Sequence, residues 1–386
     1  MCVCSFIGFA QPNPVEIKID PENMPEGKIG LYDIVESIEY VPLETKEECL
    51  IGNGVLCDMD DQYMLISYPE GDSLYLFDRK GKFIRSIGTQ GIGPEEYMYA
   101  GYSFLDTENR CIIVADRGKA LFFDLRGRFL WSSPIPIDDR TTQLYSHGRF
   151  IRMAKSYLYR DSVYSVYTIY DQKGKLRKEA VRSVRIPLQA DKAYRIAFAA
   201  CTTASAYVYN NMPHVWEYLN DTVYVIDGLN NFHPKYVFHL GKYKVTPEIQ
   251  GDMKHFHERA ANCVIVNALI ETSDYLLIQY YYQSYLQMKS HYCYYDKKEK
   301  RTYRFDTENG FPNDYDGGFD FKWNSFLYQR NNLAYTYLMA DNFVDTELRS
   351  EQTPRGPQSA VQAFEKLVKK VDPDDNPIIM IVKLKE

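Results

Sequence analysis

The stretch SLYLFDRKGKFIRSIG, residues 73–88, consists of an alternating apolar run, an aspartate, a glycine three residues later and a second strand-like run. This order is typical of a tight β-hairpin. Asp78 stands at the first turn position, where its side chain can accept backbone N–H groups, and Gly81 stands at the fourth, where a left-handed conformation is often required. The sequence therefore predicts two antiparallel strands joined at Asp78–Gly81.

The same hairpin pattern recurs along the chain. Close copies are KALFFDLRGRFLWSSP (119–134) and YSVYTIYDQKGKLRKEA (164–180), and weaker ones lie at 222–241 and 291–306. Two further strand-like runs precede each hairpin, which makes four short strands per repeat. Repeats of this size and composition are typical of β-propeller blades. The fold class is thus all-β, a β-propeller of four-stranded antiparallel blades.

Five blades account for the five hairpins, and a sixth follows from the strand-like runs that remain. Runs at 319–327, 332–340 and 377–385 supply three strands, and the fourth comes from the other end of the chain. Pairing residues 37–44 beside the C-terminal strand removes an open sheet edge. We therefore expect residues 11–386 to form a single six-bladed β-propeller domain closed by an N-terminal strand.

Two segments depart from the β pattern and predict helical insertions. In TPEIQGDMKHFHERA (246–260), Thr246 is a suitable N-cap and is followed by a proline at the first helical position. In PQSAVQAFEKLVKKV (357–371), Val361, Phe364 and Val368 recur at helical spacing.

Composition excludes several classes of protein. The 386 residues carry a net charge of −7, so no basic surface for nucleic acid is expected. No apolar run reaches the length of about 18 residues that a membrane-spanning helix needs. Aromatic residues make up 15% of the chain and most of them are tyrosine, which favours strands. We expect a monomer without a membrane span.

The first ten residues, MCVCSFIGFA, are apolar with small residues before Gln11, as at the end of a signal peptide. We interpret residues 1–10 as the remnant of such a peptide and expect export to the periplasm or cell surface, with Cys4 as a candidate lipid anchor. No C-x-x-C pair occurs among the eight cysteines. Most of them lie in apolar runs and are predicted to be buried thiols, although a local Cys49–Cys57 bridge is the alternative.

The chain resembles two groups of propeller proteins. FDRKGKFIRSIGTQGIGPEEY (77–97) is similar to NHL-type repeats, and the segments 37–52, 219–228 and 374–385 resemble six-bladed β-propeller proteins of Bacteroidetes whose function is largely unassigned. This resemblance implies a TolB-like six-bladed fold and an exported protein that is periplasmic or lipid-anchored. It implies no catalytic residues, because that family has no agreed ones.

Motifs with a known chemistry are few. The glycines of GTQGIGPEEY (88–97) form neither a Walker pattern nor the start of a helix after a strand, so they are interpreted as turn residues. His255 and His257 would diverge by about 200° on a helix and cannot readily share one ion. No metal, cofactor or catalytic residue is predicted, but a carboxylate pair gathered from different blades stays open.

The candidate ligand-binding residues are Arg117, His214, Trp216 and Tyr218. NMPHVWEYLND (211–221) is interpreted as a loop whose aromatic side chains could stack on a sugar or clamp a peptide. Arg117 lies in the equivalent loop of the second blade. The alternative for Trp216 is that it fills a gap between blades.

These features favour an exported, non-catalytic binding or scaffold propeller that recognises a glycan, peptide or protein through loops on one face. The alternatives are a hydrolase or lyase acting on a carbohydrate at the channel mouth, and an assembly component that docks another protein. Tyrosines and neutral polar groups at the mouth would favour binding, whereas ionisable groups converging on the axis would favour an enzyme.

Overall fold

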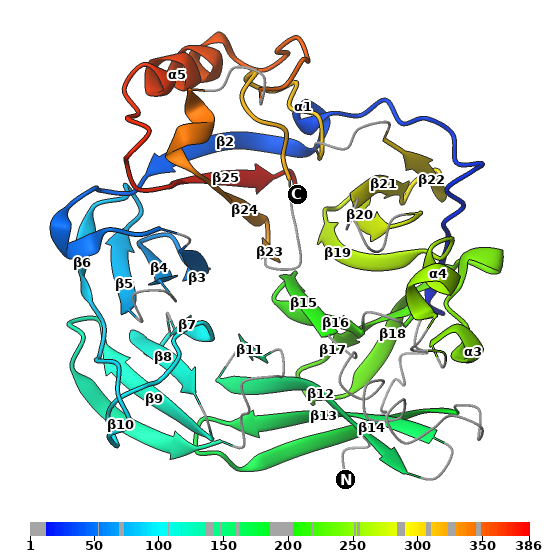
Figure 1. The fold of residues 1–386 in the computed structure, drawn as a ribbon, viewed down its shortest axis with the longest axis horizontal. Helices are drawn as coiled ribbons and strands as arrows, with labels where there is room; N and C mark the ends of the chain where they lie inside the picture. The colour runs from blue at the N-terminus through cyan, green and yellow to red at the C-terminus, as the bar shows by residue number, and fades with distance from the viewer. Residues whose placement is uncertain are drawn as a thin grey trace, which may run out of the picture.

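A computed structural model describes most of the chain. The described residues are 13–52, 54–68, 73–106, 108–116, 118–135, 143–146, 148–159, 162–185, 204–217, 220–250, 252, 255–283, 290–305, 310–322, 329–344 and 349–386. Their strands are arranged as a β-propeller around a central axis (Figure 1).

Four separate antiparallel sheets each contain four consecutive strands. They are β3 (Val55–Met59), β4 (Tyr63–Tyr68), β5 (Ser73–Asp78) and β6 (Phe83–Ser86); β7 (Ser103–Asp106), β8 (Cys111–Asp116), β9 (Lys119–Asp124) and β10 (Phe129–Pro134); β11 (Gln143–Ser146), β12 (Arg149–Tyr159), β13 (Ser162–Asp171) and β14 (Leu176–Arg185); and β19 (Ile265–Glu271), β20 (Tyr275–Tyr281), β21 (Ser290–Asp296) and β22 (Arg301–Arg304).

The other strands form one nine-stranded sheet. Its order is β1 (Val15–Lys18), β18 (Phe232–His239), β17 (Thr222–Ile226), β16 (Met212–Glu217), β15 (Ala204–Tyr209), β23 (Gln329–Arg330), β24 (Leu333–Leu338), β25 (Ile378–Leu384) and β2 (Val35–Pro42). The six separate blades expected from the sequence are therefore not observed in the hydrogen bonding. The reason is local, because β15 and β23 meet in a parallel bridge between Val208 and Arg330 that joins two groups of strands.

The predicted turn chemistry is confirmed. Asp78 Oδ1 accepts the backbone N–H groups of Lys80 and Lys82 at 2.8 and 2.9 Å, and Gly81 has a φ of 82°. Asp124 and Asp171 bind their turns in the same way, as do Asp227 and Asp296 in the two weaker copies. The left-handed residue of these two turns is Asn230, at the position of the turn glycine, and Lys300, one residue later than that position; both have positive φ.

The turn glycines also set the spacing between neighbouring sheets. A Cβ on Gly81 would lie 1.9 Å from the carbonyl oxygen of Pro42, the last residue of β2. The equivalent distances are 3.0 Å from Gly127 to Ser86 O and 2.1 Å from Gly174 to Pro134 O. Each of these turns therefore packs its backbone directly on the end of the outer strand of the preceding sheet.

The N-terminal segment closes the ring, as predicted. β2 pairs with β25 in antiparallel register, from Val35 opposite Leu384 to Pro42 opposite Ile378. The preceding residues form a strap along the outside of the ring (Figure 1, blue). β1 adds to β18 in parallel, and the N–H of Gly27 donates to Arg304 O at 2.7 Å, so the outer edges of β18 and β22 are covered.

The apolar core lies between consecutive groups of strands. Side chains of neighbouring groups form six buried clusters, each represented by one pair: Leu76 with Leu121, Ile113 with Phe150, Ile169 with Val215, Trp216 with Leu276, Leu277 with Val382, and Ile381 with Ile66. The sheets thus pack face to face around the axis, and side chains on both faces of a strand contribute to the core.

Helices are few. The predicted helix 246–260 is two short helices, α3 (Pro247–Gln250) and α4 (Phe256–Ala260), because Asp252 accepts the N–H of His255 and starts a new turn there. α5 (Gln358–Val368) lies inside the second predicted segment and buries Phe364. The short α1 (Leu31–Ile34) precedes β2, and η1 (Glu47–Cys49), η3 (Gly241–Tyr243) and η5 (Ala340–Phe343) are 3₁₀ turns. Among the described residues, no helix has the length and apolar character to cross a bilayer.

The described cysteines are buried thiols, as the sequence analysis predicts. Cys49, Cys57, Cys111, Cys263 and Cys293 are free and buried. The alternative bridge between Cys49 and Cys57 is not formed.

The close approach at the turns can be tested with two glycines that have nearly the same φ. Gly81 (82°) faces Pro42 O, whereas a Cβ on Gly118 (85°) would meet no atom closer than 4.0 Å. We expect Gly118→Ala to lower the free energy of unfolding by about 1 kcal/mol through backbone strain alone. Gly81→Ala should cost a further ~1–3 kcal/mol because the sheets must separate. Urea unfolding of both variants measures the difference, and equal losses would contradict it.

Candidate functional site

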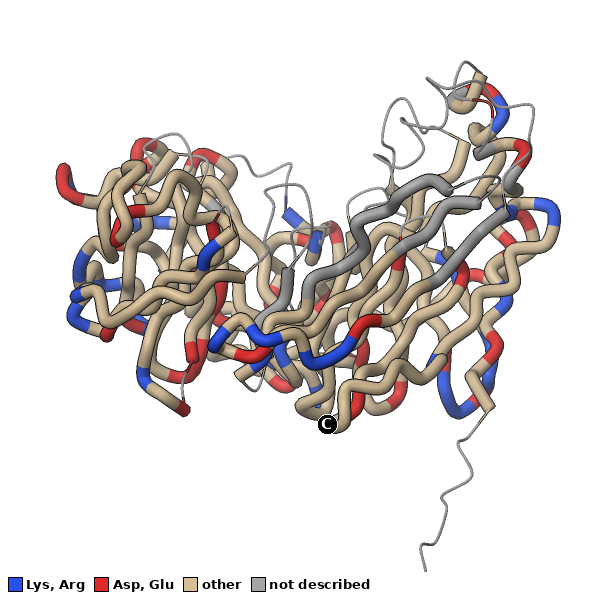
Figure 2. The backbone as a smooth tube through the Cα atoms, turned by 90° about the horizontal axis from the view of Figure 1, so that it is seen from below, with Lys and Arg blue, Asp and Glu red and all other residues tan. Residues whose placement is uncertain are grey.

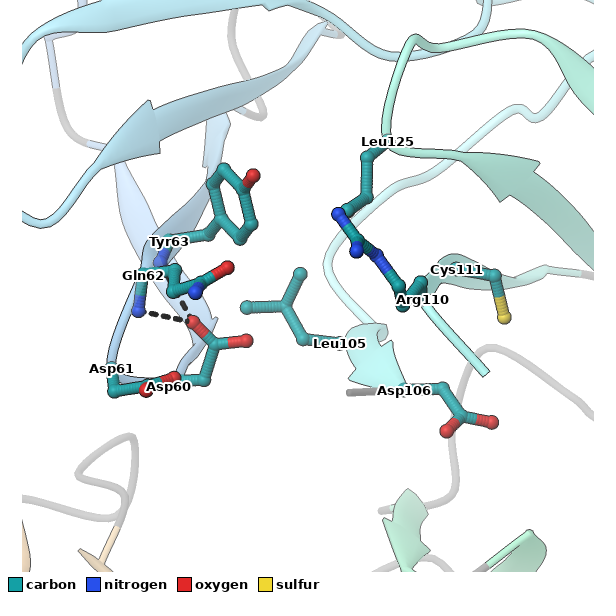
Figure 3. Close-up of a pocket in the computed structure, with 9 residues that line it drawn as sticks. All are labelled: Asp60, Asp61, Gln62, Tyr63, Leu105, Asp106, Arg110, Cys111 and Leu125. Carbon is teal, nitrogen blue, oxygen red and sulfur yellow. Dashed lines mark hydrogen bonds between the residues drawn. The ribbon is translucent and has the colours of Figure 1, made fainter. Parts of the chain in front are cut away.

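Two cavities open beside turns that join the first and second strands of their groups. Successive antiparallel strands reverse direction, so these turns all lie on the same face of the ring. The smaller cavity, of about 250 Å³, lies between the β3–β4 and β7–β8 turns (Figure 3). The larger, of about 480 Å³, lies between the β15–β16, β19–β20 and β23–β24 turns. The end of the chain after β25 reaches the same face (Figure 2).

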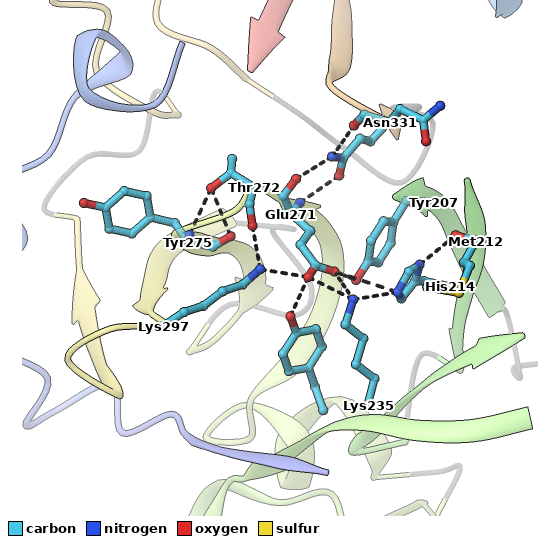
Figure 4. A network of polar contacts seen from close by, with 11 residues as sticks. Tyr207, Met212, His214, Lys235, Glu271, Thr272, Tyr275, Lys297 and Asn331 are labelled. Atoms are coloured by element: carbon cyan, nitrogen blue, oxygen red, sulfur yellow. Dashed lines mark hydrogen bonds and ion pairs between the residues drawn. The ribbon is translucent and has the colours of Figure 1, made fainter. Parts of the chain in front are cut away.

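A buried carboxylate stands behind the larger cavity. β19 is buried along its whole length and ends in Glu271, which is 1% exposed. Its Oε1 accepts hydrogen bonds from Tyr236 Oη at 2.6 Å and Lys297 Nζ at 2.8 Å. Its Oε2 accepts from Tyr207 Oη at 2.7 Å and Lys235 Nζ at 2.9 Å (Figure 4). Two donors on each oxygen satisfy the acceptor capacity of the group.

The surroundings keep Glu271 ionised. Burial alone would raise the pKa of the carboxyl, but the charges of Lys297 and Lys235 outweigh burial and lower it to about 2. Burial first, and then the charge of Glu271, raise the pKa values of Tyr207 and Tyr236. Glu271 is therefore a fixed anion and its two tyrosine partners are fixed donors.

His214 belongs to the same cluster and is neutral. Its ring is fully buried and stacks on Tyr207 at a centroid distance of 4.6 Å. Nδ1 lies 2.9 Å from Met212 O and Nε2 lies 2.8 Å from Lys235 Nζ, so Nδ1–H donates and Nε2 accepts. Burial first, and then the charge of Lys235, lower the pKa of His214 to about 4.

Glu271 links three groups of strands through its backbone and its side chain together. Its N–H donates to Gln329 Oε1 at 2.7 Å, and Gln329 Nε2 donates back to Glu271 O at 2.5 Å. Gln329 is in β23, Glu271 is in β19, and two of the four donors, Tyr207 and Lys235, come from β15 and β18.

Two Asn-Asn turns meet in front of this cluster. Asn210, Asn211 and Asn331 all have positive φ, which asparagine tolerates better than most residues. The N–H of Asn211 donates to Asn331 Oδ1 at 2.8 Å, and Asn331 Nδ2 donates to Asn211 Oδ1 at 2.9 Å. Sequence reasoning missed both turns, although each Asn-Asn pair between two strand-like runs is a hairpin signal.

The larger cavity is named here the asparagine cavity. It is lined by Tyr209, Asn210, Asn211, Glu271, Thr272, Ser273, Asn331, Asn332, Leu384, Lys385 and Glu386. The Nζ atoms of Lys235 and Lys297 lie 5.1 and 5.3 Å from the centroid of the Tyr209 ring. The wall thus combines an aromatic ring, amides and hydroxyls with a carboxylate that is already fully bonded.

The structure places the residues predicted from the sequence differently. Segment 212–217 is strand β16 and not a loop, since Pro213 and Val215 pack on one face while His214 and Trp216 are buried on the other. Trp216 is 3% exposed in the core between groups of strands, as in the alternative interpretation. Arg117 and Tyr218 lie outside the described residues, and their role in binding stays a prediction.

Two motifs have structural explanations. In the loop 88–97 it is carbonyl groups that converge on a cation: Lys119 Nζ donates to Gly93 O at 2.9 Å and to Glu96 O at 2.6 Å. His255 is paired with Asp252 at 3.0 Å. In the described part of the chain, no three His, Cys, Asp or Glu side chains are grouped so that they could hold a metal ion.

A family model described as a domain of unknown function, DUF4934, matches residues 14–383. The chain belongs to the DUF4934 family. No curated protein sequence matches it. The match spans the strap, the sheets and the closing strand β25, so the ring as a whole is the DUF4934 fold.

Comparison with solved structures finds matches at low sequence identity. One is a Bacteroides fragilis protein whose name describes it, by inference, as an exported protein. It has 16% sequence identity and a TM-score of 0.65, and the match covers 96% of this chain and 99% of that chain. A DUF4221 member from Bacteroides vulgatus has 10% identity and a TM-score of 0.43, with coverages of 91% and 97%. The WD40 domain of Neurospora crassa Pan2 has 11% identity and a TM-score of 0.37, with coverages of 86% and 90%. The first of these supports the propeller fold of this DUF4934 chain and says nothing of its ligand.

The bonding of Glu271 predicts the effect of removing one donor. Lys297→Met leaves Oε1 with Tyr236 and the ion pair to Lys235 and removes one of two compensating charges, so the free energy of unfolding should fall by about 2–3 kcal/mol. The neighbouring Lys298 is exposed, and Lys298→Met is the matched control with an expected change within about 0.5 kcal/mol. Urea unfolding at pH 7 compares them. Equal stabilities would show that Lys297 contributes nothing to the cluster.

The neutral state of His214 predicts a pH dependence of stability. Folding lowers the pKa from 6.5 to about 4, so the unfolded chain binds more protons between these values and stability falls as the pH drops from 6.5 toward 4. The loss attributable to His214 is about 3 kcal/mol at pH 4. His214→Asn should flatten the stability profile in this window, whereas the exposed control His239→Asn should leave it unchanged. Parallel profiles for the wild type and His214→Asn would refute the assignment.

Proposed function

We propose that this protein is an exported six-bladed propeller that binds a neutral glycan in the asparagine cavity without chemically changing it. The observation that carries the proposal is the wall of the cavity, where Tyr209 and four asparagines stand in front of an ion cluster that is bonded within itself. Aromatic rings stack on sugar rings, and amides can both donate to and accept from sugar hydroxyls.

Six blades are supported by the core. The six apolar clusters each join consecutive groups of strands, and the last joins β25 back to β4, so the series runs once around the ring. In this count the nine-stranded sheet is two blades, β15–β18 and β23–β25 with β2. Their junction is the Val208–Arg330 bridge, and β1 is an additional edge strand.

Binding is favoured over catalysis by the state of the ionisable groups. A general acid or base needs a proton acceptor or donor that the substrate can reach. Glu271 already has four donors, and His214 uses both ring nitrogens within the cluster. The alternative, a carbohydrate hydrolase or lyase, is supported by the proximity of His214 Nε2 and Glu271 Oε2, which are 3.9 Å apart. The test below includes this alternative.

Location at the periplasm or cell surface is part of the proposal. It is supported by the apolar residues 1–10 and by the inferred export of the Bacteroides fragilis protein with the same fold. Arg117 and Tyr218 would then contribute to a second contact on the opposite face, where the turns between second and third strands lie. A peptide or protein partner in place of a glycan is an outcome of the test.

The test is calorimetric titration of the purified chain with a panel of neutral oligosaccharides. Asn210→Gly keeps the left-handed backbone but removes the amide, so we expect about fivefold weaker binding of the sugar that the wild type prefers. Ser273→Trp should abolish binding by filling the cavity. Asn230→Gly, at another left-handed asparagine that does not line the cavity, is the matched control and should bind as the wild type does.

The same samples are assayed for new reducing ends and unsaturated products. Their appearance, and its loss in Glu271→Gln, would establish the enzyme alternative in place of binding. Binding that is insensitive to both cavity variants, or confined to peptides, would refute the proposed glycan site.

A further inference from the structure

The smaller cavity has a polar rim and an apolar floor. Leu105, which is 2% exposed, forms the floor, and Tyr63 and Leu125 flank it (Figure 3). This cavity lies between the first two sheets and shares no lining residue with the asparagine cavity. Its chemistry can therefore be considered separately.

One wall of this cavity carries carboxylates. Asp60 Oδ1 accepts the N–H groups of Gln62 and Tyr63 at 2.8 and 2.7 Å, so its side chain is held by the turn. Asp61 is exposed, and no hydrogen bond or ion pair joins it to the part of the chain that the structure describes. Asp61 is thus a carboxylate at the rim without a partner among the described residues.

The opposite wall carries the guanidinium of Arg110, which also has no partner among the described residues. The Arg110 side chain lies across the cavity from Asp60 and Asp61, and within the described ranges it has no hydrogen-bond or ion-pair partner. Its backbone is left-handed, with a φ of 52°. Among the described residues, four of the other six non-glycine residues with positive φ are asparagines, which tolerate this conformation better than arginine does. An arginine at a left-handed position, with no side-chain partner among the described residues, suggests a functional role.

We propose that this cavity binds a small zwitterion of dipeptide size, with its carboxylate on Arg110, its ammonium group on Asp61 and an apolar side chain over Leu105. A simple anion would pair with Arg110 but would be repelled by the carboxylates of Asp60 and Asp61. A simple cation would leave Arg110 unpaired. The third carboxylate of the lining, Asp106, accepts hydrogen bonds from Asn109 and Gln172 at 2.8 and 3.0 Å. The charges of Asp61 and Arg110 on opposite walls are complementary to a ligand that carries both signs.

The cavity size fits this ligand class. A volume of about 250 Å³ is at the lower end of small-molecule sites, which suits a dipeptide better than an oligosaccharide or a folded partner. Arg110 presents a planar fork of donors that can bind a carboxylate through two parallel hydrogen bonds. Because the two cavities share no lining residue, the proposed dipeptide site does not depend on the proposed glycan site.

The probe is the dipeptide alanyl-leucine, titrated calorimetrically beside its N-acetyl and C-terminal amide forms. We expect the free dipeptide to bind and each blocked form to bind at least tenfold more weakly, because each has lost one of the two charges. Asp61→Asn should weaken the free dipeptide at least tenfold and should leave the N-acetyl form unchanged.

The matched variants are Arg110→Gly and Lys300→Gly. Both residues are exposed, basic and left-handed, with φ of 52° and 55°, but Lys300 lies in the β21–β22 turn away from the cavity. Glycine adopts this backbone without strain, so both variants should keep the melting temperature within about 3 °C of the wild type. Only Arg110→Gly should lose the dipeptide.

Three results would overturn the proposal. They are no measurable heat with alanyl-leucine, equal affinities for the free and blocked forms, and unchanged affinity in Arg110→Gly.

Discussion

The arrangement of the ring depends on the hydrogen bonds and ion pairs that the carboxylate of Glu271 makes. A single buried anion is costly in an apolar interior, and here it is compensated by two ammonium groups and two phenols that reach it from β15, β18 and the β21–β22 turn. Since these donors cannot bond elsewhere without leaving Glu271 unpaired, the strands that carry them are held in one relative position. The Gln329 contact extends the same constraint to β23, and the bridge to β15 becomes possible.

Local features of the fold were predictable because they depend on neighbouring residues. The Asp-x-x-Gly turns, the four-strand repeat and helix α5 follow from spacing and turn chemistry, and the structure has all of them. The pairing of β2 with β25 was predictable from the need to cover a sheet edge. The merging of two groups of strands into one sheet was not, since it depends on Val208 and Arg330 approaching across the ring.

The candidate site was much less accessible from the sequence. Tryptophan and histidine in 211–221 suggested an exposed aromatic loop, but residues 212–217 form strand β16, which is buried on both faces and places Trp216 in the core. Glu271 carried a weak signal, as a charged residue that ends a mostly apolar run. Its partners come from four strands and a turn, and no spacing within one segment encodes that convergence. The pairs at 210–211 and 331–332 were readable as turns, but their contact with each other was not.

The ring can close only after the C-terminal strand β25 is available to pair with β2. Val35 cannot find Leu384 until nearly the whole sequence has been synthesised, which at typical rates takes on the order of tens of seconds. During that time β2 lacks its partner, and the apolar face that later meets the last group of strands is uncovered. Contacts this distant in sequence also slow the search for the native pairing. A chain that lacks β25 thus leaves the hydrogen-bonding edge of β2 unpaired, and edge protection arrives only when the two ends meet.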